Sequence, residues 1–269
     1  MPHLDPTWQL AVLVAAALLV VAVGLRFSRL RRTAAASQEA AVIAVLYACW
    51  RLLGAVTHRE VAGAKANALA VWRAQQTFHL PSELAMQQAI LGHHWLVEIA
   101  NAYYVYGHFN PMLALLVWVW WRHREAYPRV RLLVCVMTVV AFVAHMVPVA
   151  PPRLMPELGF HDVALEYGQS VYGSFGEGIP GQLLAMPSLH VGWAILVAYV
   201  VVTTSPSGWR WLVLLHPVVM SVDVVVTANH WWSDGLAAGA ILALYLAVER
   251  AARWWSKRLA FAALAPART

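Results

Sequence analysis

Long apolar stretches constrain this chain more than any other feature. A helix needs about 20 mostly apolar residues to cross a bilayer, and seven stretches of the 269-residue sequence reach or approach that length. They are residues 8–25, 40–57, 98–121, 131–149, 187–205, 210–228 and 234–254. Only 12% of the residues are charged, about half the share found in soluble domains. The sequence therefore predicts an all-α, polytopic membrane helical bundle with about six to seven transmembrane helices.

The basic residues are distributed unevenly around these stretches, and this predicts an orientation. Cytoplasmic loops of membrane proteins carry an excess of Lys and Arg. With seven spans and the N-terminus outside, nearly all basic residues fall on the inner side. The exceptions are Arg51 within a span and the outer Arg59, Lys65, Arg73 and Arg153. The first stretch is expected to remain as an uncleaved anchor, because arginines follow it, whereas a signal peptide has them in front.

Three segments fall on the non-cytoplasmic side in this orientation, namely residues 58–97, 150–186 and 229–234. The segment 58–97 is more polar than its neighbours and predicts one or two amphipathic helices at the interface, the second starting at Pro81. The segment 150–186 is long for a compact membrane protein, and long loops are usually functional or disordered. The Ala- and Arg-rich, Lys-poor composition favours a bacterial plasma membrane.

Two short motifs on this side predict an anion site. One is Pro151-Pro152-Arg153-Leu154, and the other runs from Ala185 to His190 with the sequence AMPSLH. Pro187 suits the first position of a helix, and the free amides of the following turn would attract a phosphate. His190 adds a titratable nitrogen to that turn. The Arg153 guanidinium matches the geometry of phosphate oxygens.

A third motif, Asn229 to Asp234 with the sequence NHWWSD, predicts an oriented histidine. His230 and Asp234 are four residues apart, so they share a face if a helix begins by His230. A carboxylate that holds one imidazole nitrogen leaves the other free to attack. Together the three motifs favour phosphoryl transfer through a covalent phosphohistidine, with no cofactor and no metal site.

These motifs resemble those of the type 2 phosphatidic acid phosphatase (PAP2) superfamily, whose second motif centres on Pro-Ser-x-His and whose third ends in His-x-x-x-Asp. The Pro-Pro-Arg-Leu run and the Asn-His-aromatic sequence are similar to the inositol phosphorylceramide synthase branch. So is the upstream pattern Asn101-x-x-Tyr104-x-x-x-His108. The resemblance covers about residues 68–248. The chain departs from the superfamily at Val224, where an Arg is usual, and it shows no Lys-x6-Arg-Pro first motif.

The resemblance implies a role for each matching residue. His230 would be the nucleophile, Asp234 would orient it, and His190 would protonate the leaving oxygen and then act as a base. The residues implied at the substrate are Arg153, Ser188, Asn229, Tyr104 and His108. Since Val224 replaces the usual Arg, the phosphate charge needs other cations, and Arg73 and Lys65 are further candidates.

The resemblance also implies a division of the chain. Residues 1–57 would form N-terminal transmembrane helices and residues 58–97 an interfacial amphipathic segment. Residues 98–257 would form the catalytic membrane core, followed by a cytoplasmic tail at residues 258–269.

The predicted function is phosphoryl transfer on a membrane lipid phosphate at the outer leaflet, with no nucleic acid partner. Water as acceptor would make the protein a lipid phosphate phosphatase, and an alcohol would make it a head-group transferase of the inositol-phosphate type. Two alternatives stay open. One is a transporter with Asp223, His145 and Glu98 along its path. The other is a metal-dependent membrane oxidoreductase using some of the 12 histidines, with His93-His94 as a weak hint.

Overall fold

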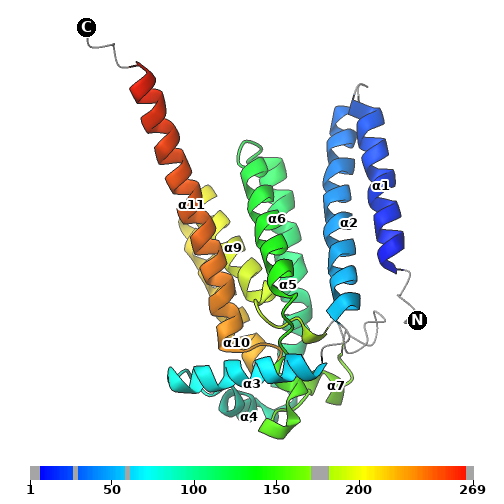
Figure 1. The fold of residues 1–269 in the computed structure, drawn as a ribbon, viewed down its shortest axis with the longest axis vertical. Coiled ribbons are helices and arrows are strands. Elements are labelled where there is room, and N and C mark those ends of the chain that lie inside the picture. The colour runs from blue at the N-terminus through cyan, green and yellow to red at the C-terminus, as the bar shows by residue number, and fades with distance from the viewer. Residues whose placement is uncertain (1–6, 27–29, 58–60, 171–181, 265–269) are drawn as a thin grey trace.

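The computed structural model describes residues 7–26, 30–57, 61–170 and 182–264, and the chain is all-α across these ranges (Figure 1). The only pairing of extended segments within them is an isolated bridge between Val149 and Leu184. The predicted fold class is therefore confirmed.

Each predicted apolar stretch overlaps a helix that runs lengthwise through the molecule (Figure 1). Four of the described helical segments are long and apolar enough to cross a membrane: Gln9–Arg26, Tyr127–Ala144, Gly208–Val226 and Trp232–Leu259. The segment Leu189–Thr204 is apolar but shorter. In chain order the lengthwise helices are α1 (Thr7–Arg26), α2 (Arg31–Thr57), α5 (His94–Arg122), α6 (Tyr127–Ala144), α9 (Leu189–Thr204), α10 (Leu215–Val226) and α11 (Trp232–Leu264).

The helices that do not run lengthwise gather at one end of the bundle, at the bottom of Figure 1. They are α3 (Val61–Thr77), α4 (Glu83–Leu91) and α7 (Val163–Glu166), with the short 3-10 turns η1 (Pro152–Leu154) and η2 (Pro156–Leu158). We call this the motif end, because α9 and α11 begin there. The opposite end holds the last turn of α5, the start of α6 and the 3-10 helix η4 (Gly208–Leu214).

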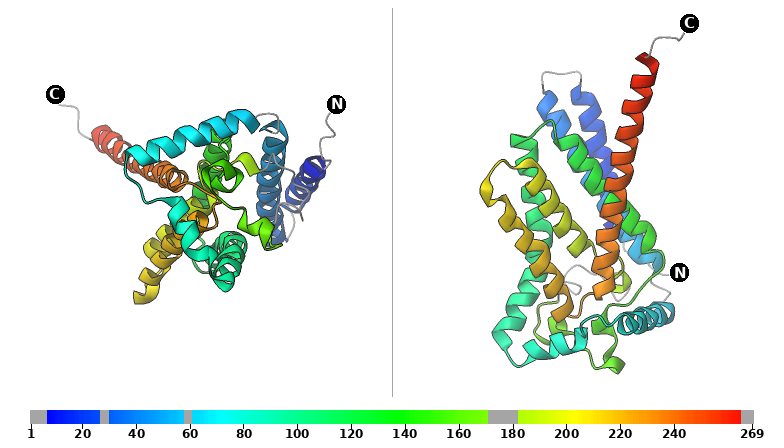
Figure 2. Two further views of the ribbon diagram at one scale, coloured as in Figure 1. Left: turned by 90° about the horizontal axis from the view of Figure 1, so that it is seen from below. Right: turned by 90° about the vertical axis from the view of Figure 1, so that its left-hand side faces the viewer.

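The polar segment 58–97 folds largely as predicted from its sequence. It forms α3 and α4, which lie across the motif end (Figures 1 and 2). The second helix starts at Glu83 and not at Pro81, because the Ser82 side chain accepts a hydrogen bond from the Ala85 amide and so acts as the N-cap.

Small residues let α9 and α11 cross closely near the motif end. A Cβ placed on Gly192 would lie 3.2 Å from the Cβ of Ala238, and one on Gly235 would lie 3.2 Å from a methyl carbon of Val191. Close backbone approach through small residues is typical of helix packing in membranes. It brings the first turns of α9 and α11, which carry two of the three motifs, next to each other.

An extended segment at residues 148–151 connects the elements of the motif end. The Val149 amide donates to the Leu183 carbonyl at 2.9 Å, and the Ala185 amide donates to the Val149 carbonyl at 3.2 Å. The Ala150 amide reaches the Ala64 carbonyl of α3 at 3.1 Å. These bonds satisfy buried backbone groups that would otherwise be costly, and they hold the first motif against the second.

Ion pairs join the helices toward the opposite end. Arg129 of α6 forms a bidentate pair with Glu249 of α11, with N–O distances of 2.8 and 2.7 Å. Arg131 of α6 pairs with Glu39 of α2. Glu249 lies well inside α11, which continues to Leu264. Part of the segment 258–269, expected to be a tail, is therefore helical.

The two ends lead to a test of the orientation predicted from the basic residues. Cysteines introduced by Glu157→Cys at the motif end and by Glu125→Cys at the opposite end should face opposite sides of the membrane, in a background with Cys49 and Cys135 replaced by Ala. An impermeant maleimide applied to intact cells should label only the first variant. Labelling of only the second would invert the orientation, and labelling of both would contradict a bundle that spans the membrane.

Candidate active site

His230 lies at the motif end in the turn between α10 and α11, and its ring is held at one nitrogen. Nδ1 lies 3.1 Å from Oδ2 of Asp234 and 2.9 Å from the carbonyl oxygen of Ala185. The carbonyl can only accept a hydrogen bond, so Nδ1 carries the proton and donates it. This tautomer leaves the lone pair on Nε2, and His230 is only 5% exposed.

The contact between His230 and Asp234 arises differently from the prediction. The helix α11 starts at Trp232, so His230 precedes it and the two residues do not share a helical face. Oδ2 of Asp234 instead accepts from the Trp231 amide at 2.9 Å as well as from the imidazole. The carboxylate thus closes a tight turn at the helix start, where a negative charge is favourable.

The second motif is attached to the third through the backbone. The Ser188 amide donates to the Asp234 carbonyl at 3.0 Å, and the Ser188 side chain accepts from the Val191 amide at 3.3 Å. Ser188 is therefore the N-cap of α9, and Pro187 lies before the cap, not at the first helical position as predicted. The Ser188 amide, expected to face a phosphate, is engaged within the protein.

His190 lies in a column of stacked rings above this turn. Its ring centroid is 4.1 Å from that of Tyr104 and 4.1 Å from that of His108, with interplanar angles of 15° and 28°. His108 in turn stacks on Trp193 at 4.5 Å. The ring centroids of His190 and His230 are 5.6 Å apart. The structure thus brings both predicted catalytic histidines together, with Tyr104 and His108 beside them.

Arg153 lies beside this site but is tied into the protein. Its Nε donates to Oδ1 of Asn229 at 2.9 Å, and its Nη1 donates to Asp162 at 3.0 Å and to Gln182 at 2.7 Å. The Arg153 side chain is 2% exposed in its pair with Asp162. Asn229 also donates to the Thr227 hydroxyl at 3.0 Å. Arg153 and Asn229, both predicted to bind substrate, therefore stabilise the turn that carries His230.

Val224, at the position where the superfamily has Arg, belongs to an apolar cluster with Tyr104, Val191 and Met220. Its carbonyl accepts the amides of Asn229 and His230, at 2.9 and 3.0 Å. The position therefore supports the catalytic turn through its backbone, and no cationic side chain can reach the site from it.

The other basic candidates for a phosphate clamp lie on α3. Lys65 pairs with Glu157 at 3.3 Å in an exposed contact, and Arg73 is exposed. Within the described parts of the chain, neither side chain forms a hydrogen bond or ion pair with a motif residue.

Sequence reasoning missed a pair of buried polar residues that hold the start of α11. Gln75 and Glu83, each 4% exposed, lie on α3 and α4 and hydrogen-bond to each other at 2.7 Å. Gln75 accepts the Ser233 amide at 2.8 Å, and Glu83 accepts the Trp232 amide at 3.3 Å. They satisfy first-turn amides that have no partner within the helix. A glutamate beside Ser82 is a helix-start signal in the sequence. Nothing in the sequence indicates that this glutamate contacts α11.

His145, proposed in the transporter alternative, also lies near this site. Its Nε2 is 3.1 Å from the Pro187 carbonyl, and its Nδ1 is buried without a partner among the described residues. Asp223 is buried in α10, whereas Glu98 is exposed on α5. No hydrogen bond or ion pair joins these three residues within the described ranges. In the same ranges, no group of three or more His, Cys, Asp or Glu side chains is arranged to hold a metal ion.

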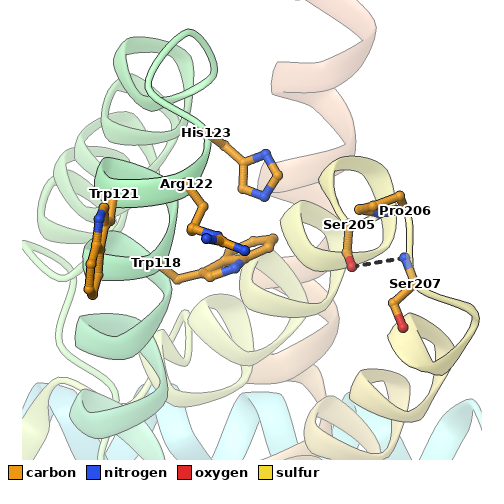
Figure 3. A pocket seen from close by; sticks show the side chains of 7 residues that line it. All are labelled: Trp118, Trp121, Arg122, His123, Ser205, Pro206 and Ser207. Carbon is orange, nitrogen blue, oxygen red and sulfur yellow. Dashed lines mark hydrogen bonds between the residues drawn. The ribbon is translucent and has the colours of Figure 1, made fainter.

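A cleft of about 670 Å³ lies at the opposite end of the molecule from these histidines, between the last turn of α5 and the turn that follows α9 (Figure 3). We call it the α5–α9 cleft. It is lined by Trp118, Trp121, Arg122, His123, Ser205, Pro206 and Ser207, and it contains none of the motif residues.

Comparison with known proteins identifies the family. The sequence model of the PAP2 superfamily matches residues 69–248, which include all three motifs. No curated protein and no solved structure matches the chain.

The buried Glu83 leads to a prediction about stability and pH. Burial raises the pKa of Glu83 above its ordinary value of 4.5. The unfolded chain therefore loses this proton at a lower pH than the folded protein does, so the folded state loses stability as the pH rises through that window. Glu83→Gln cannot ionise and keeps the acceptor oxygen. Its melting temperature relative to the unmodified protein should therefore rise between pH 4.5 and pH 8, measured in detergent.

Glu157→Gln is the matched control for this measurement. A hydrogen bond to the backbone amide of Glu157, helped by Lys65, lowers the pKa of that carboxyl. Ionisation of Glu157 therefore stabilises the folded state as the pH rises, and the melting temperature of its variant relative to the unmodified protein should not rise across the window. Absence of a rise for Glu83→Gln would contradict the assignment.

Proposed function

The chain belongs to the PAP2 superfamily, and on that premise we propose that it transfers a phosphoryl or phospho-head group from a membrane lipid through a phosphohistidine at His230. Members of this superfamily are phosphatases and phosphotransferases, so the chain is an enzyme of that broad class. The observation that carries the proposal is the ring of His230, whose Nδ1–H is held by Asp234 and Ala185 while Nε2 keeps its lone pair.

In the first proposed step, Nε2 of His230 attacks the phosphorus atom and the bond from phosphorus to the leaving oxygen breaks. His190 gives its proton to that oxygen. The imidazole of His230 becomes positively charged as the P–N bond forms, and the carboxylate of Asp234 stabilises this charge. The ring centroids of the two histidines are 5.6 Å apart, which supports their action on one phosphorus atom.

In the second proposed step, His190 takes a proton from the acceptor, whose oxygen attacks phosphorus as the P–N bond breaks. The step regenerates His230 and leaves His190 protonated for the next turnover. With water as the acceptor, a phosphomonoester donor gives an alcohol and inorganic phosphate. With a lipid or polyol hydroxyl as the acceptor, a phosphodiester donor gives an alcohol and a new phosphodiester.

Burial of the site favours an alcohol over water as the acceptor. His230 is 5% exposed and Asp234 is fully buried, and a closed site limits hydrolysis of a reactive intermediate. The Pro-Pro-Arg-Leu and Asn-His-aromatic sequences, similar to those of inositol phosphorylceramide synthases, favour the same choice. We therefore propose a head-group transferase of the inositol-phosphate type, acting on the non-cytoplasmic leaflet of a bacterial plasma membrane.

Substitutions of the three proposed catalytic residues test the mechanism. His230→Ala and Asp234→Asn should each lower kcat by a factor of about a thousand or more, because the residues act as a unit. His190→Ala should have a smaller effect on donors with a good leaving group, which need less protonation. The control His161→Ala removes an exposed imidazole at the same end and should keep normal turnover. Near-normal turnover of the lipid donor by purified His230→Ala would refute the assignment.

A donor and acceptor screen separates transfer from hydrolysis. Purified protein is incubated with lipid phosphates and phosphodiesters, with and without candidate alcohols. Free phosphate or free head group is then scored against new lipid species by mass spectrometry. We expect a new phosphodiester that forms only when the alcohol is present. Release that is independent of any alcohol would assign the protein as a phosphatase.

A further inference from the structure

We propose that the α5–α9 cleft binds the phosphate head group of an anionic membrane lipid, in the leaflet opposite the histidine site. The cleft holds about 670 Å³, a volume within the range of pockets that bind small ligands. It lies at the far ends of α5 and α9 from His190 and His230 (Figures 1 and 3). The proposal therefore does not depend on the catalytic assignment.

The lining of the cleft offers donors to a ligand. Arg122 carries five N–H groups, and His123 adds an imidazole. The Ser205 hydroxyl oxygen accepts the Ser207 amide at 3.3 Å, and the Ser207 hydroxyl oxygen accepts the Trp209 amide at 3.2 Å. Each hydroxyl therefore keeps its proton for another acceptor. None of the described lining residues is acidic, so a ligand that accepts hydrogen bonds and carries negative charge matches the cleft.

Arg122 has no ion pair or side-chain hydrogen bond within the described part of the chain, in contrast to Arg129 and Arg131. Arg129 is neutralised by Glu249 and Arg131 by Glu39. The Arg122 side chain points from α5 into the cleft, toward the turn that contains Ser205 (Figure 3). A guanidinium in this position can bind a phosphate through two parallel hydrogen bonds.

Tryptophans around the cleft indicate that its ligand comes from the membrane. Trp118 packs against His123 with ring centroids 4.5 Å apart, on the wall below Arg122 (Figure 3). Trp121 points away from the cleft and is 75% exposed, and Trp209 is 78% exposed just beyond Ser207. Tryptophan is enriched at the level of lipid head groups. The cleft therefore lies where a lipid phosphate is available at high local concentration.

Lipid binding to two variants of the same turn tests the proposal. Delipidated full-length protein in detergent is titrated with phosphatidylglycerol, and bound lipid is counted by native mass spectrometry. Arg122→Gln should weaken binding about tenfold, the effect of losing a hydrogen bond to a charged group. Arg124→Gln removes the same charge two residues away, outside the cleft lining, and should bind normally. Any lipid bound at the histidine site should be the same in both variants, so it does not affect the difference between them.

Two further ligands identify the class of molecule that is bound. Phosphatidylcholine should bind more weakly than phosphatidylglycerol, because its choline cation would face Arg122 and His123. Inorganic phosphate at matched concentration should not displace the lipid. Equal losses in Arg122→Gln and Arg124→Gln would overturn the proposal by showing a general charge effect. Displacement by inorganic phosphate would overturn it by showing a site for a free anion.

Discussion

The rest of the motif end depends on the hydrogen bonds made by the buried residue Asp234. Its Oδ2 holds the imidazole of His230 and the Trp231 amide, while its backbone carbonyl accepts the Ser188 amide. One residue thereby joins the starts of α9 and α11 and sets the tautomer of a histidine. A buried carboxylate is costly unless its hydrogen bonds are made. The turn supplies two donors to Oδ2, while Oδ1 is buried without a partner among the described residues. The glycines that let α9 and α11 approach make this geometry possible.

The electrostatics of the site differ from those expected of a phosphate pocket. Arg153 lies close to the histidines, but Asp162 balances its charge and Asn229 and Gln182 take up further donors. Val224 contributes only backbone acceptors and apolar packing. In the proposed mechanism, the negative charge on the phosphoryl oxygens would be met chiefly by imidazoles and by reorganisation around Arg153.

The two ends of the bundle present different chemistry to the membrane. The motif end is closed by α3 and α4, whose buried Gln75 and Glu83 satisfy the first amides of α11. At the opposite end, exposed tryptophans and the Arg122 guanidinium, which has no ion pair within the described part of the chain, lie beside the α5–α9 cleft. The hydrogen bonds from Gln75 and Glu83 order the first turn of α11. In the cleft, by contrast, the charge of Arg122 is available to a ligand. This difference agrees with chemistry at one surface and lipid contact at the other.

The sequence by itself determined the helical membrane fold and the set of motif residues, because apolar length and residue type are properties of the chain alone. It predicted that His190, His230 and Asp234 would share one surface, and the structure places them together. The tertiary structure decided how each is held: that Ser188 caps α9, that Arg153 pairs with Asp162, and that Glu83 supports α11. These partners are separated by up to 149 residues, as for Trp232 and Glu83. A sequence pattern records which groups need a hydrogen bond, but only the packing of helices selects the partner that supplies it.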